Sequence, residues 1–208
     1  MNERQAIIAK AVSQLGYKEG NNNENKYGAW YGMNNQPWCM IFVSWCAAQA
    51  GIGTDIIPKL AYVPYCVEFF QKQGRYHAKA GYTPRPGDLI IYGSNSHIGL
   101  VEKVVGSLVY TIEGNTSANG NSSNGDGVYR RSRPLTNSWI KGYCSPDYKE
   151  DEEVEIKTIK VKNIDSGKLI EVSAVNVGGN NYVKLRDMEK LAAVTVDWDG
   201  TYPTIKEK

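Results

Sequence analysis

The amino-acid sequence predicts an α+β fold in which helices precede an antiparallel sheet. Apolar residues recur at helical spacing over the first third of the chain. From residue 81 onward the pattern changes to short apolar runs separated by Gly, Pro, Asn and Ser. Because helices and strands are segregated along the chain, this pattern favours α+β over a sheet wound with alternating helices.

The first expected helix covers residues 3–15. Asn2 has a side chain suited to an N-cap, and Gly16 can adopt the left-handed conformation that ends a helix. Residues 17–35 follow, and their many Asn and Gly predict an irregular loop. The aromatic residues of this loop either line a groove for sugar or peptide or fix the loop to the core.

The second expected helix starts near Pro37, which suits a first turn because its missing N–H costs nothing there. Residues 40–50 are apolar on nearly every side, which predicts a buried helix, and Gly51 ends it. A third helix is expected over residues 62–73 and ends at Gly74.

Strands are expected in the rest of the first region, and Gly106-Ser107 is typical of a hairpin connection between two of them. In that hairpin residue 97 pairs near residue 116, so Glu113 or Asn115 lies close to His97. The expected strands cover residues 89–92, 97–105, 108–113, 127–132 and 139–143.

The pattern divides the chain into three regions: a domain over residues 1–145, an acidic linker over 146–154 and a small α+β module over 155–208. The first region carries 14 Lys and Arg against 9 Asp and Glu, a net charge of +5. This charge favours a polyanionic partner such as a bacterial wall or nucleic acid, although ordinary surface variation explains it equally well. In the module we expect strands at 157–162, 168–177 and 193–197 and a helix at 185–191.

The four cysteines lack the paired spacing of a zinc site and are too few for a disulfide scaffold. We expect all four to be reduced, with Cys46 and Cys66 as core residues. Residues 1–5 contain no apolar signal core, and no segment is apolar enough to span a bilayer. The expectation is a chain made in the cytosol, which leaves by another route if it works outside the cell.

The candidate site centres on Cys39, at the start of the buried second helix. Backbone N–H groups and the helix dipole there stabilise a thiolate, which is the nucleophilic form of cysteine. A thiolate–imidazole pair needs groups at the ends of separate elements, and His97 opens a strand. A third group must orient the imidazole, and Glu113 closes the neighbouring strand. Each residue taken singly is more often structural, so the prediction rests on the ordered set.

At these residues the sequence resembles the CHAP domain family (cysteine, histidine-dependent amidohydrolase/peptidase). The segment from Pro37 to Trp45 is similar to its cysteine motif. Residues 86–90 and 96–101 are similar to its histidine motif, and residues 112–115 to its third motif. The resemblance covers about residues 5–145 and implies a papain-like fold that cleaves peptidoglycan amide bonds.

By this resemblance, Cys39 is the nucleophile, His97 the base and acid, Glu113 the residue that orients the histidine, and Asn115 a supporting polar group. The candidate substrate-binding residues are Trp38, Tyr31 and Gln36. The backbone N–H of Cys39 is the expected oxyanion donor, and the second donor stays open. No cofactor and no metal are expected, since residues 18–31 hold no Asp for the calcium loop of some family members.

Residues 179–187 and 196–199 resemble the modules named after the copper amine oxidase N-terminal domain. Residues 146–208 contain no His or Cys, so a copper site is not expected. The module is either a spacer or dimerisation unit or a wall-binding unit.

Together these observations predict a modular hydrolase of bacterial peptidoglycan, either an N-acetylmuramoyl-L-alanine amidase or an endopeptidase of the stem or cross-bridge. Peptidoglycan is the expected partner, without nucleic acid or membrane, and the module leaves oligomerisation open. The missing signal fits a phage or prophage endolysin released through holin pores. The alternatives are a catalytically silent wall-binding protein and a cysteine protease acting on other amides.

Overall fold

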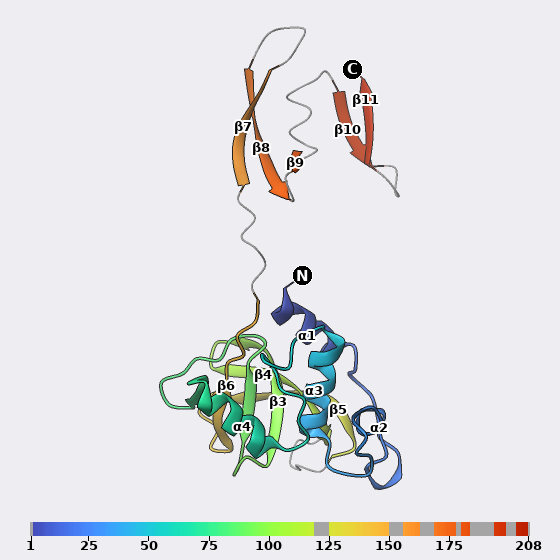
Figure 1. Ribbon diagram of the computed structural model, residues 1–208, viewed down its shortest axis with the longest axis vertical. Helices are drawn as coiled ribbons and strands as arrows, with labels where there is room; N and C mark the ends of the chain where they lie inside the picture. Colours follow the sequence, from blue (N-terminus) through green and yellow to red (C-terminus); the bar gives the residue numbers. More distant parts are fainter. Residues whose placement is uncertain are drawn as a thin grey trace. The chain divides into compact units, whose positions relative to one another are not determined.

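The computed structural model describes residues 2–118 and 125–149 in full and the backbone of five strands between residues 156 and 207. The chain divides into two compact units, Met1–Glu150 and Asp151–Lys208, and each is treated by itself (Figure 1). No helix among the described residues is long and apolar enough to cross a lipid bilayer.

The helices of the first unit include the three that the sequence predicts. The Asn2 side chain caps the first helix by accepting from the N–H of Gln5 at 2.9 Å. This helix ends at Val12 instead of residue 15, because the next turns close with shorter-range bonds, such as Leu15 N–H to the Val12 carbonyl. The helices are α1 (Glu3–Val12), η1 (Asn21–Asn23), α2 (Lys26–Tyr31), α3 (Cys39–Gln49) and α4 (Val63–Lys72).

The prediction of an irregular loop over residues 17–35 is wrong, because η1 and α2 lie within it. The Asn25 side chain caps α2 by accepting from the N–H of Gly28 at 2.7 Å. Tyr27 is fully buried, and its ring packs against those of Trp38, Phe42 and Trp45. Packing of this ring against α3 therefore outweighs the poor helix propensity of the segment.

The start of α3 also differs from the prediction. Pro37 precedes the helix, Trp38 occupies the N-cap position, and Cys39 is the first helical residue. The N–H of Phe42 donates to the Trp38 carbonyl at 2.8 Å, which closes the first turn. Cys39 is thus the first residue of the helix, two positions nearer to its N-terminal end than in a helix that starts at Pro37.

A six-stranded sheet forms the other half of the first unit, in the order β1-β6-β2-β3-β4-β5 with antiparallel neighbours. All five predicted strands are present, and β1 is the one described strand of this unit that the sequence pattern does not predict. The strands are β1 (Tyr76–Ala78), β2 (Leu89–Tyr92), β3 (His97–Val105), β4 (Leu108–Thr116), β5 (Gly127–Pro134) and β6 (Ile140–Cys144).

The hairpin of β3 and β4 contains an irregularity that changes the predicted register. Near the turn Val104 pairs with Val109, but beyond a shift between Val101 and Lys103 the partner of Leu100 is Ile112. Continued to the start of β3, this register sets residue 97 opposite residue 115, not 116. The bulge consumes one extra residue on β3, and this is the physical reason for the difference.

The core of the first unit lies on both faces of the sheet. On one face, residues of α1, α3 and α4 pack with Leu89, Ile98 and Ile112 in a large apolar cluster. Helix α3 lies against β3 and β4 (Figure 1). A smaller cluster around Tyr92 and Val101 covers the other face. This α+β arrangement, in which the helices precede an antiparallel sheet along the chain, agrees with the fold class that the sequence predicts.

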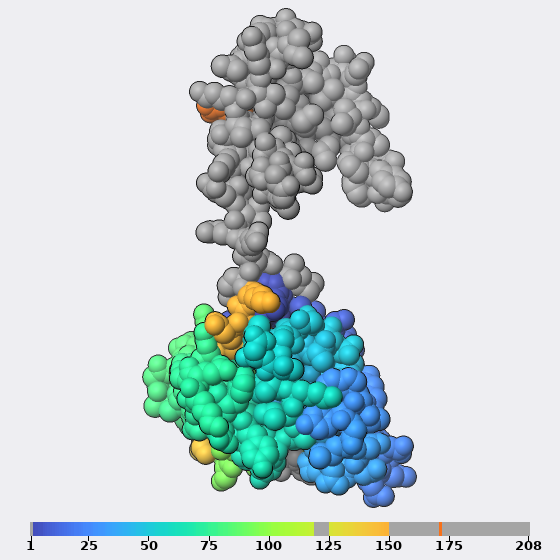
Figure 2. Space-filling model, viewed as in Figure 1, coloured from blue at the N-terminus to red at the C-terminus, as the bar shows by residue number. Residues whose placement is uncertain are grey.

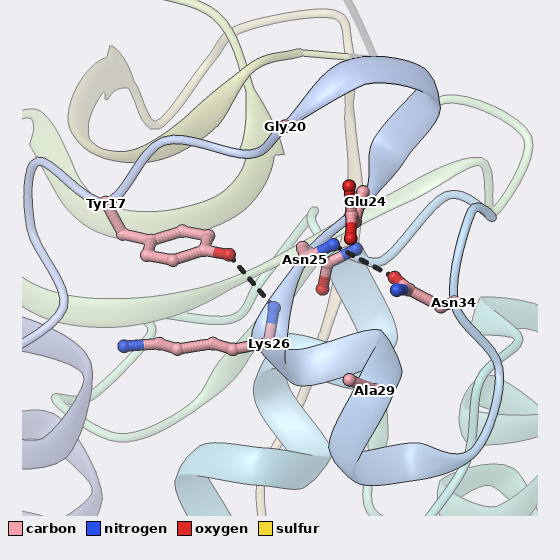
Figure 3. Close-up of a pocket in the computed structure, with 7 residues that line it drawn as sticks. All are labelled: Tyr17, Gly20, Glu24, Asn25, Lys26, Ala29 and Asn34. Carbon is pink, nitrogen blue, oxygen red and sulfur yellow. Dashed lines mark hydrogen bonds between the residues drawn. The ribbon is translucent and has the colours of Figure 1, made fainter.

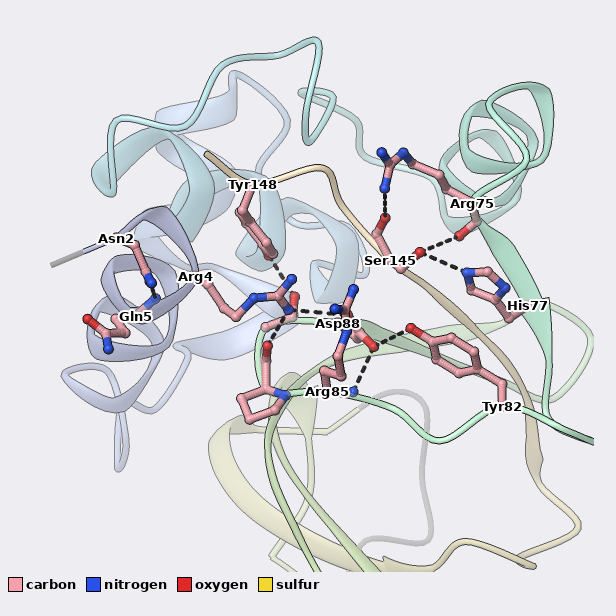
Figure 4. Close-up of polar contacts among 12 residues, drawn as sticks. Asn2, Arg4, Gln5, Arg75, His77, Tyr82, Arg85, Asp88, Ser145 and Tyr148 are labelled. Atoms are coloured by element: carbon pink, nitrogen blue, oxygen red, sulfur yellow. Dashed lines mark hydrogen bonds and ion pairs between the residues drawn. The ribbon is translucent and has the colours of Figure 1, made fainter. Parts of the chain in front are cut away.

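Residues 146–149, predicted as the start of the linker, are instead attached to the first unit (Figure 4). Tyr148 is buried and its hydroxyl donates to the Gly87 carbonyl at 2.6 Å, while the Arg4 guanidinium lies over its ring. Asp147 pairs with Arg75 at 2.6 Å. The acidic composition predicted a solvated linker. The buried side chain of Tyr148 instead attaches this segment to the first unit, and the overall charge of the segment gives no sign of that contact.

In the second unit the structure describes two small antiparallel sheets, in the orders β7-β8-β9 and β10-β11. The three predicted strands correspond to β7, β8 and β10, whereas β9 and β11 are not predicted by the sequence pattern. The helix predicted at 185–191 lies outside the described residues. The strands are β7 (Ile156–Lys162), β8 (Leu169–Val177), β9 (Asn180–Val183), β10 (Val194–Trp198) and β11 (Pro203–Glu207).

Candidate active site

Cys39 lies at the first position of α3, and 5% of its surface is exposed. No side chain caps this end of the helix, since the N-cap residue Trp38 makes no such hydrogen bond. The N–H groups of a first helical turn have no partner within the helix. The sulfur atom therefore sits where these groups and the helix dipole favour a negative charge.

His97 begins β3 beside Tyr92 of β2, and its side chain is fully buried. Its Nε2 lies 3.0 Å from the Glu113 Oε2. Its Nδ1 is buried and makes no hydrogen bond of ordinary length with any described residue. The Cys39 thiol nevertheless lies near enough to raise the pKa of the ring. One ring nitrogen is thus fixed by Glu113 and the other is left for the thiol.

The electrostatics of this pair favour a charged imidazole. Burial alone would lower the pKa of His97, but hydrogen bonding to Cys39 and Glu113 and their negative charge outweigh it and raise the pKa to about 9. Burial would likewise raise the pKa of Glu113, yet the hydrogen bond and charge of His97 and the charge of Arg133 lower it to about 2. Glu113 is therefore ionised at neutral pH and faces a ring that readily holds a proton.

Glu113 is held by three residues that the sequence motifs do not identify. Its Oε1 accepts from the Tyr92 hydroxyl at 2.8 Å, from the Thr111 hydroxyl at 2.7 Å and from the Arg133 Nη1 at 2.7 Å. The spacing of Thr111 and Glu113 on one strand was visible in the sequence, because alternate residues share a face. Arg133 lies on β5, opposite Val109, and only the strand register brings it to Glu113.

Aromatic rings support the same group of side chains. The Trp139 ring stacks on Tyr92, with ring centroids 4.5 Å apart, and lies nearly parallel to His97 at 5.8 Å. The Arg133 guanidinium lies over the Tyr92 ring, 4.7 Å from its centroid. These contacts restrict the rotation of the imidazole and of the guanidinium, so the charged groups are held by packing as well as by hydrogen bonds.

Gly99 gives the Glu113 side chain its space. A Cβ atom built on Gly99 would lie 2.7 Å from the Glu113 Cγ, closer than real Cβ contacts come. We expect Gly99→Ala to displace the carboxylate and to lower kcat/KM by about 10²-fold, the usual scale for a 1 Å misplacement. Steady-state hydrolysis at matched stability measures this, with Gly106→Ala in the hairpin turn as control. Unchanged kcat/KM in Gly99→Ala would contradict it.

Asn115 connects β4 to the start of α3. In the orientation that satisfies both amide atoms, its oxygen accepts from the Trp38 N–H at 3.2 Å and its nitrogen donates to the Gly125 carbonyl at 3.0 Å. The residue is fully buried and has a left-handed backbone with φ 52°. Asn115 therefore fixes the residue before Cys39, a more specific role than general polar support.

The three predicted substrate-binding residues occupy different environments in the structure, and only one of them lines the groove at Cys39. Trp38 is fully buried, stacks on Tyr27 and donates its indole N–H to Glu19, so its side chain is a core residue, contrary to the prediction. Tyr31 is half-buried beside Lys59 and is not among the residues that line the groove at Cys39. Gln36 lines that groove.

The groove beside Cys39 has a volume of about 580 Å³. Its walls come from the segment before α3, from the start of α4 and from the turn between β2 and β3. The lining residues are Met33, Gln36, Pro37, Cys39, Ala61, Tyr62, Val63, Pro64, Ser94, Asn95 and Ser96.

A second, polar hollow of about 330 Å³ lies beside α2 (Figure 3). Hydrogen bonds from the N–H of Lys26 to the Tyr17 hydroxyl and from the N–H of Asn25 to the Asn34 side chain, both 2.9 Å, order its walls. Glu24 supplies the one carboxylate among its lining residues. In the part of the chain that the structure describes, no group of three or more His, Cys, Asp or Glu is arranged to hold a metal ion.

The other histidine and the other cysteines have structural positions. His77 lies on the edge strand β1, where its ring stacks on Tyr82 and its Nε2 lies 2.8 Å from the Ser145 hydroxyl (Figure 4). All four cysteines are free thiols, as predicted, and all are buried. Burial raises the pKa of the Cys46 and Cys144 thiols, which makes them poor nucleophiles.

Residues 29–115 match the family model of the CHAP domain. This part of the chain is a CHAP domain. The matched segment contains Cys39, His97, Glu113 and Asn115, so the site lies within the family's own region. The search of curated proteins found no match.

Solved structures also resemble the chain at low sequence identity. The peptidoglycan hydrolase RipB from Mycobacterium tuberculosis is 17% identical with a TM-score of 0.41, covering 69% of this chain and 64% of that one. Ly7917 is 15% identical with a TM-score of 0.43, covering 86% and 85%. The resuscitation promoting factor interacting protein RipA is 18% identical with a TM-score of 0.43, covering 71% and 63%. The chain thus spans less than two thirds of RipB and RipA.

Proposed function

We propose that this chain hydrolyses amide bonds of bacterial peptidoglycan, with Cys39 as nucleophile, His97 as acid and base, and Glu113 as the residue that orients His97. The observation that carries the proposal is the buried His97 ring, fixed by Glu113 through one nitrogen and facing the Cys39 thiol with the other. The CHAP family match over these residues supports the same chemistry.

In the proposed reaction the Cys39 thiolate attacks the amide carbonyl carbon, and the carbonyl oxygen takes up the negative charge. The backbone N–H of Cys39, at the first position of α3, is the proposed oxyanion donor. When the C–N bond breaks, the His97 imidazolium gives its proton to the leaving amine and a thioester remains on Cys39. Water then attacks the thioester while His97 takes the proton, which releases the acid and restores the thiolate.

The proposal extends to the whole chain in two further respects. The second unit serves either to bind the wall or to join copies of the chain, and the division into catalytic domain, linker and module stays a prediction. Release through holin pores as a phage or prophage lysis enzyme also stays a prediction. The charge of the first region, net +5, is compatible with an anionic wall as substrate.

Purified peptidoglycan tests the proposed reaction directly. Incubation with the full chain should release soluble fragments and new primary amines, one for each amide bond cut. Casein under the same conditions should yield no new amines. Release of amines from casein would instead favour the alternative of a general cysteine protease. The proposal fails if the wall gains no amines while the protein is folded by circular dichroism.

The pH dependence of kcat/KM tests the role of Glu113. With the pKa of His97 raised to about 9, activity should hold through neutral pH and fall as the imidazolium loses its proton near pH 9. Glu113→Gln removes the negative charge that raises this pKa, so the basic limb should move to lower pH and kcat/KM should fall about 10²- to 10⁴-fold. A basic limb that stays in place in Glu113→Gln would show that the carboxylate does not act on His97.

Stability should follow the same titration. The pKa of His97 is raised in the fold from 6.5 to about 9, so its contribution to the free energy of unfolding is fully present below pH 6.5. That contribution is lost as pH rises from 6.5 to 9. Urea unfolding at several pH values measures the loss, and His97→Gln, which cannot titrate, should show a smaller decline over this window.

A further inference from the structure

The groove beside Cys39 carries no charged side chain among its lining residues, all of which the structure describes. Its polar groups are hydroxyls and amides, supplied by Gln36 on one wall and by residues 94–96 in the turn between β2 and β3. A carboxylate that enters the groove would lose water without gaining an ionic partner, which costs free energy. A primary amide of the same shape loses less, because it is neutral and these groups can replace its hydrogen bonds to water.

Exposed apolar side chains make the groove still less favourable for a charged group. Met33 and Tyr62 line it, with 45% and 58% of their surfaces exposed, and the ring of Tyr65, 59% exposed, lies edge-on to that of Tyr62 at 5.3 Å. Helix α4, which carries Tyr65, and the segment that leads into it form part of the face seen in the space-filling view (Figure 2). A substrate that covers these side chains displaces water from them, so a charge bound beside them loses further hydration.

The reactive sulfur atom adds a negative charge at the same place. In the proposed reaction Cys39 is a thiolate, whereas the balancing positive charge lies on His97, which is fully buried and does not line the groove. The thiolate therefore repels a substrate carboxylate in the groove at close range. The N–H groups at the start of α3 favour anions, but a carboxylate bound there would take the place of the oxyanion and block the attack.

The net charge of +5 over residues 1–145 acts at a different range. It attracts an anionic wall from a distance, and salt screens it beyond about 8–10 Å. None of the Lys and Arg side chains that contribute to it lines the groove, so none neutralises a carboxylate there. The approach to the wall thus favours an anionic polymer, whereas the groove favours an uncharged segment of it.

We propose that the groove selects stem peptides whose carboxylates are amidated, so that the chain cleaves amidated peptidoglycan in preference to the free-acid form. The second residue of a stem peptide is D-isoglutamate in one form of the wall and D-isoglutamine in the other. The two forms differ there only in a carboxylate or a primary amide. This inference rests on the proposed function and names the substrate class of the same site. The sugar–peptide bond and the bonds of the stem lie within two residues of this position, so the selection applies to either.

Two forms of one wall test the selection. Purified peptidoglycan with D-isoglutamate stems is divided, and in one half the carboxylates are converted to primary amides with ammonia and a carbodiimide. The full chain should release amines from the amidated half at least about tenfold faster, although that half attracts the basic domain less strongly. Equal or faster release from the free-acid half overturns this inference while leaving the proposed function intact. No release from either half overturns the proposed function and the inference with it.

A cation placed in the groove should weaken the selection. Ser94→Lys and Gln36→Lys supply an ionic partner from two different walls, and each should raise the rate on the free-acid half relative to the amidated half about three- to tenfold. Ser107→Lys, the same change on an exposed turn outside the groove, is the matched control, because it adds an equal charge to the domain. Each ratio is taken within one variant, so a loss of folded protein cancels. An unchanged ratio in both groove variants, or an equal rise in Ser107→Lys, overturns the proposal.

Discussion

Cys39→Ala is expected to abolish the release of amines from purified peptidoglycan, with a loss of about 10⁴-fold or more in rate. The reason is that the proposed reaction passes through a thioester on this sulfur, and no other described thiol lies at the start of a helix beside a histidine. Turbidity of a wall suspension and amine release over time measure the effect. The variant should still sediment with walls, since it removes one sulfur atom and leaves the other groove residues and the second unit unchanged.

Cys46→Ala is the matched control for this experiment. Cys46 lies on the same helix, is 1% exposed and has a thiol whose pKa is raised by burial. Its removal leaves a small cavity in the core, so the free energy of unfolding should fall while kcat/KM stays close to wild type. If Cys39→Ala still clears walls, or if Cys46→Ala is the inactive variant, the proposed mechanism is wrong.

Arg133→Met should have the largest effect on stability, lowering the free energy of unfolding by about 3–5 kcal/mol. The Arg133 guanidinium and the Glu113 carboxylate form a buried ion pair at 2.7 Å, with 10% and 0% of their side chains exposed. Removing one partner leaves a buried charge without compensation. Chemical denaturation measures the loss, and kcat/KM should also fall because the carboxylate that orients His97 loses its anchor.

Arg133→Met should also change how the free energy of unfolding falls at acid pH. The folded pKa of Glu113 is lowered from 4.5 to about 2, so the stability it contributes is present above pH 4.5 and is lost as pH falls toward 2. Without Arg133 the folded pKa rises, and this loss should begin at higher pH. An unchanged acid profile in Arg133→Met would contradict the assigned ion pair.

Arg130→Met provides the comparison. Arg130 lies on the same strand and binds Glu102 through two nitrogens at 2.7 and 2.8 Å, but 46% of its side chain is exposed. An exposed pair contributes about 0–1 kcal/mol, so this variant should remain near wild-type stability and activity. The double variant Arg133→Met, Glu113→Leu should regain part of the lost stability without activity, which separates the fold from the chemistry.

The elements that the sequence predicts are those specified by local pattern. The hairpin at residues 106–107 and the helix at 62–73 appear within a few residues of the expected bounds. Cys39 at a helix start, His97 at a strand start and Glu113 on the next strand also follow from spacing alone. These predictions hold because each depends on neighbours in the chain, through side-chain period and turn residues.

The tertiary structure decided what depends on residues far apart in the chain. It brings Arg133 to Glu113 through the register of β4 and β5, and it buries Trp38 against Tyr27. It also anchors Tyr148 on the domain, where composition predicted a linker. The sequence by itself thus determined which residues stand at the ends of helix and strand, because local periodicity carries that information. Only packing decided which partners hold them, because side-chain burial and strand register are set by the whole domain.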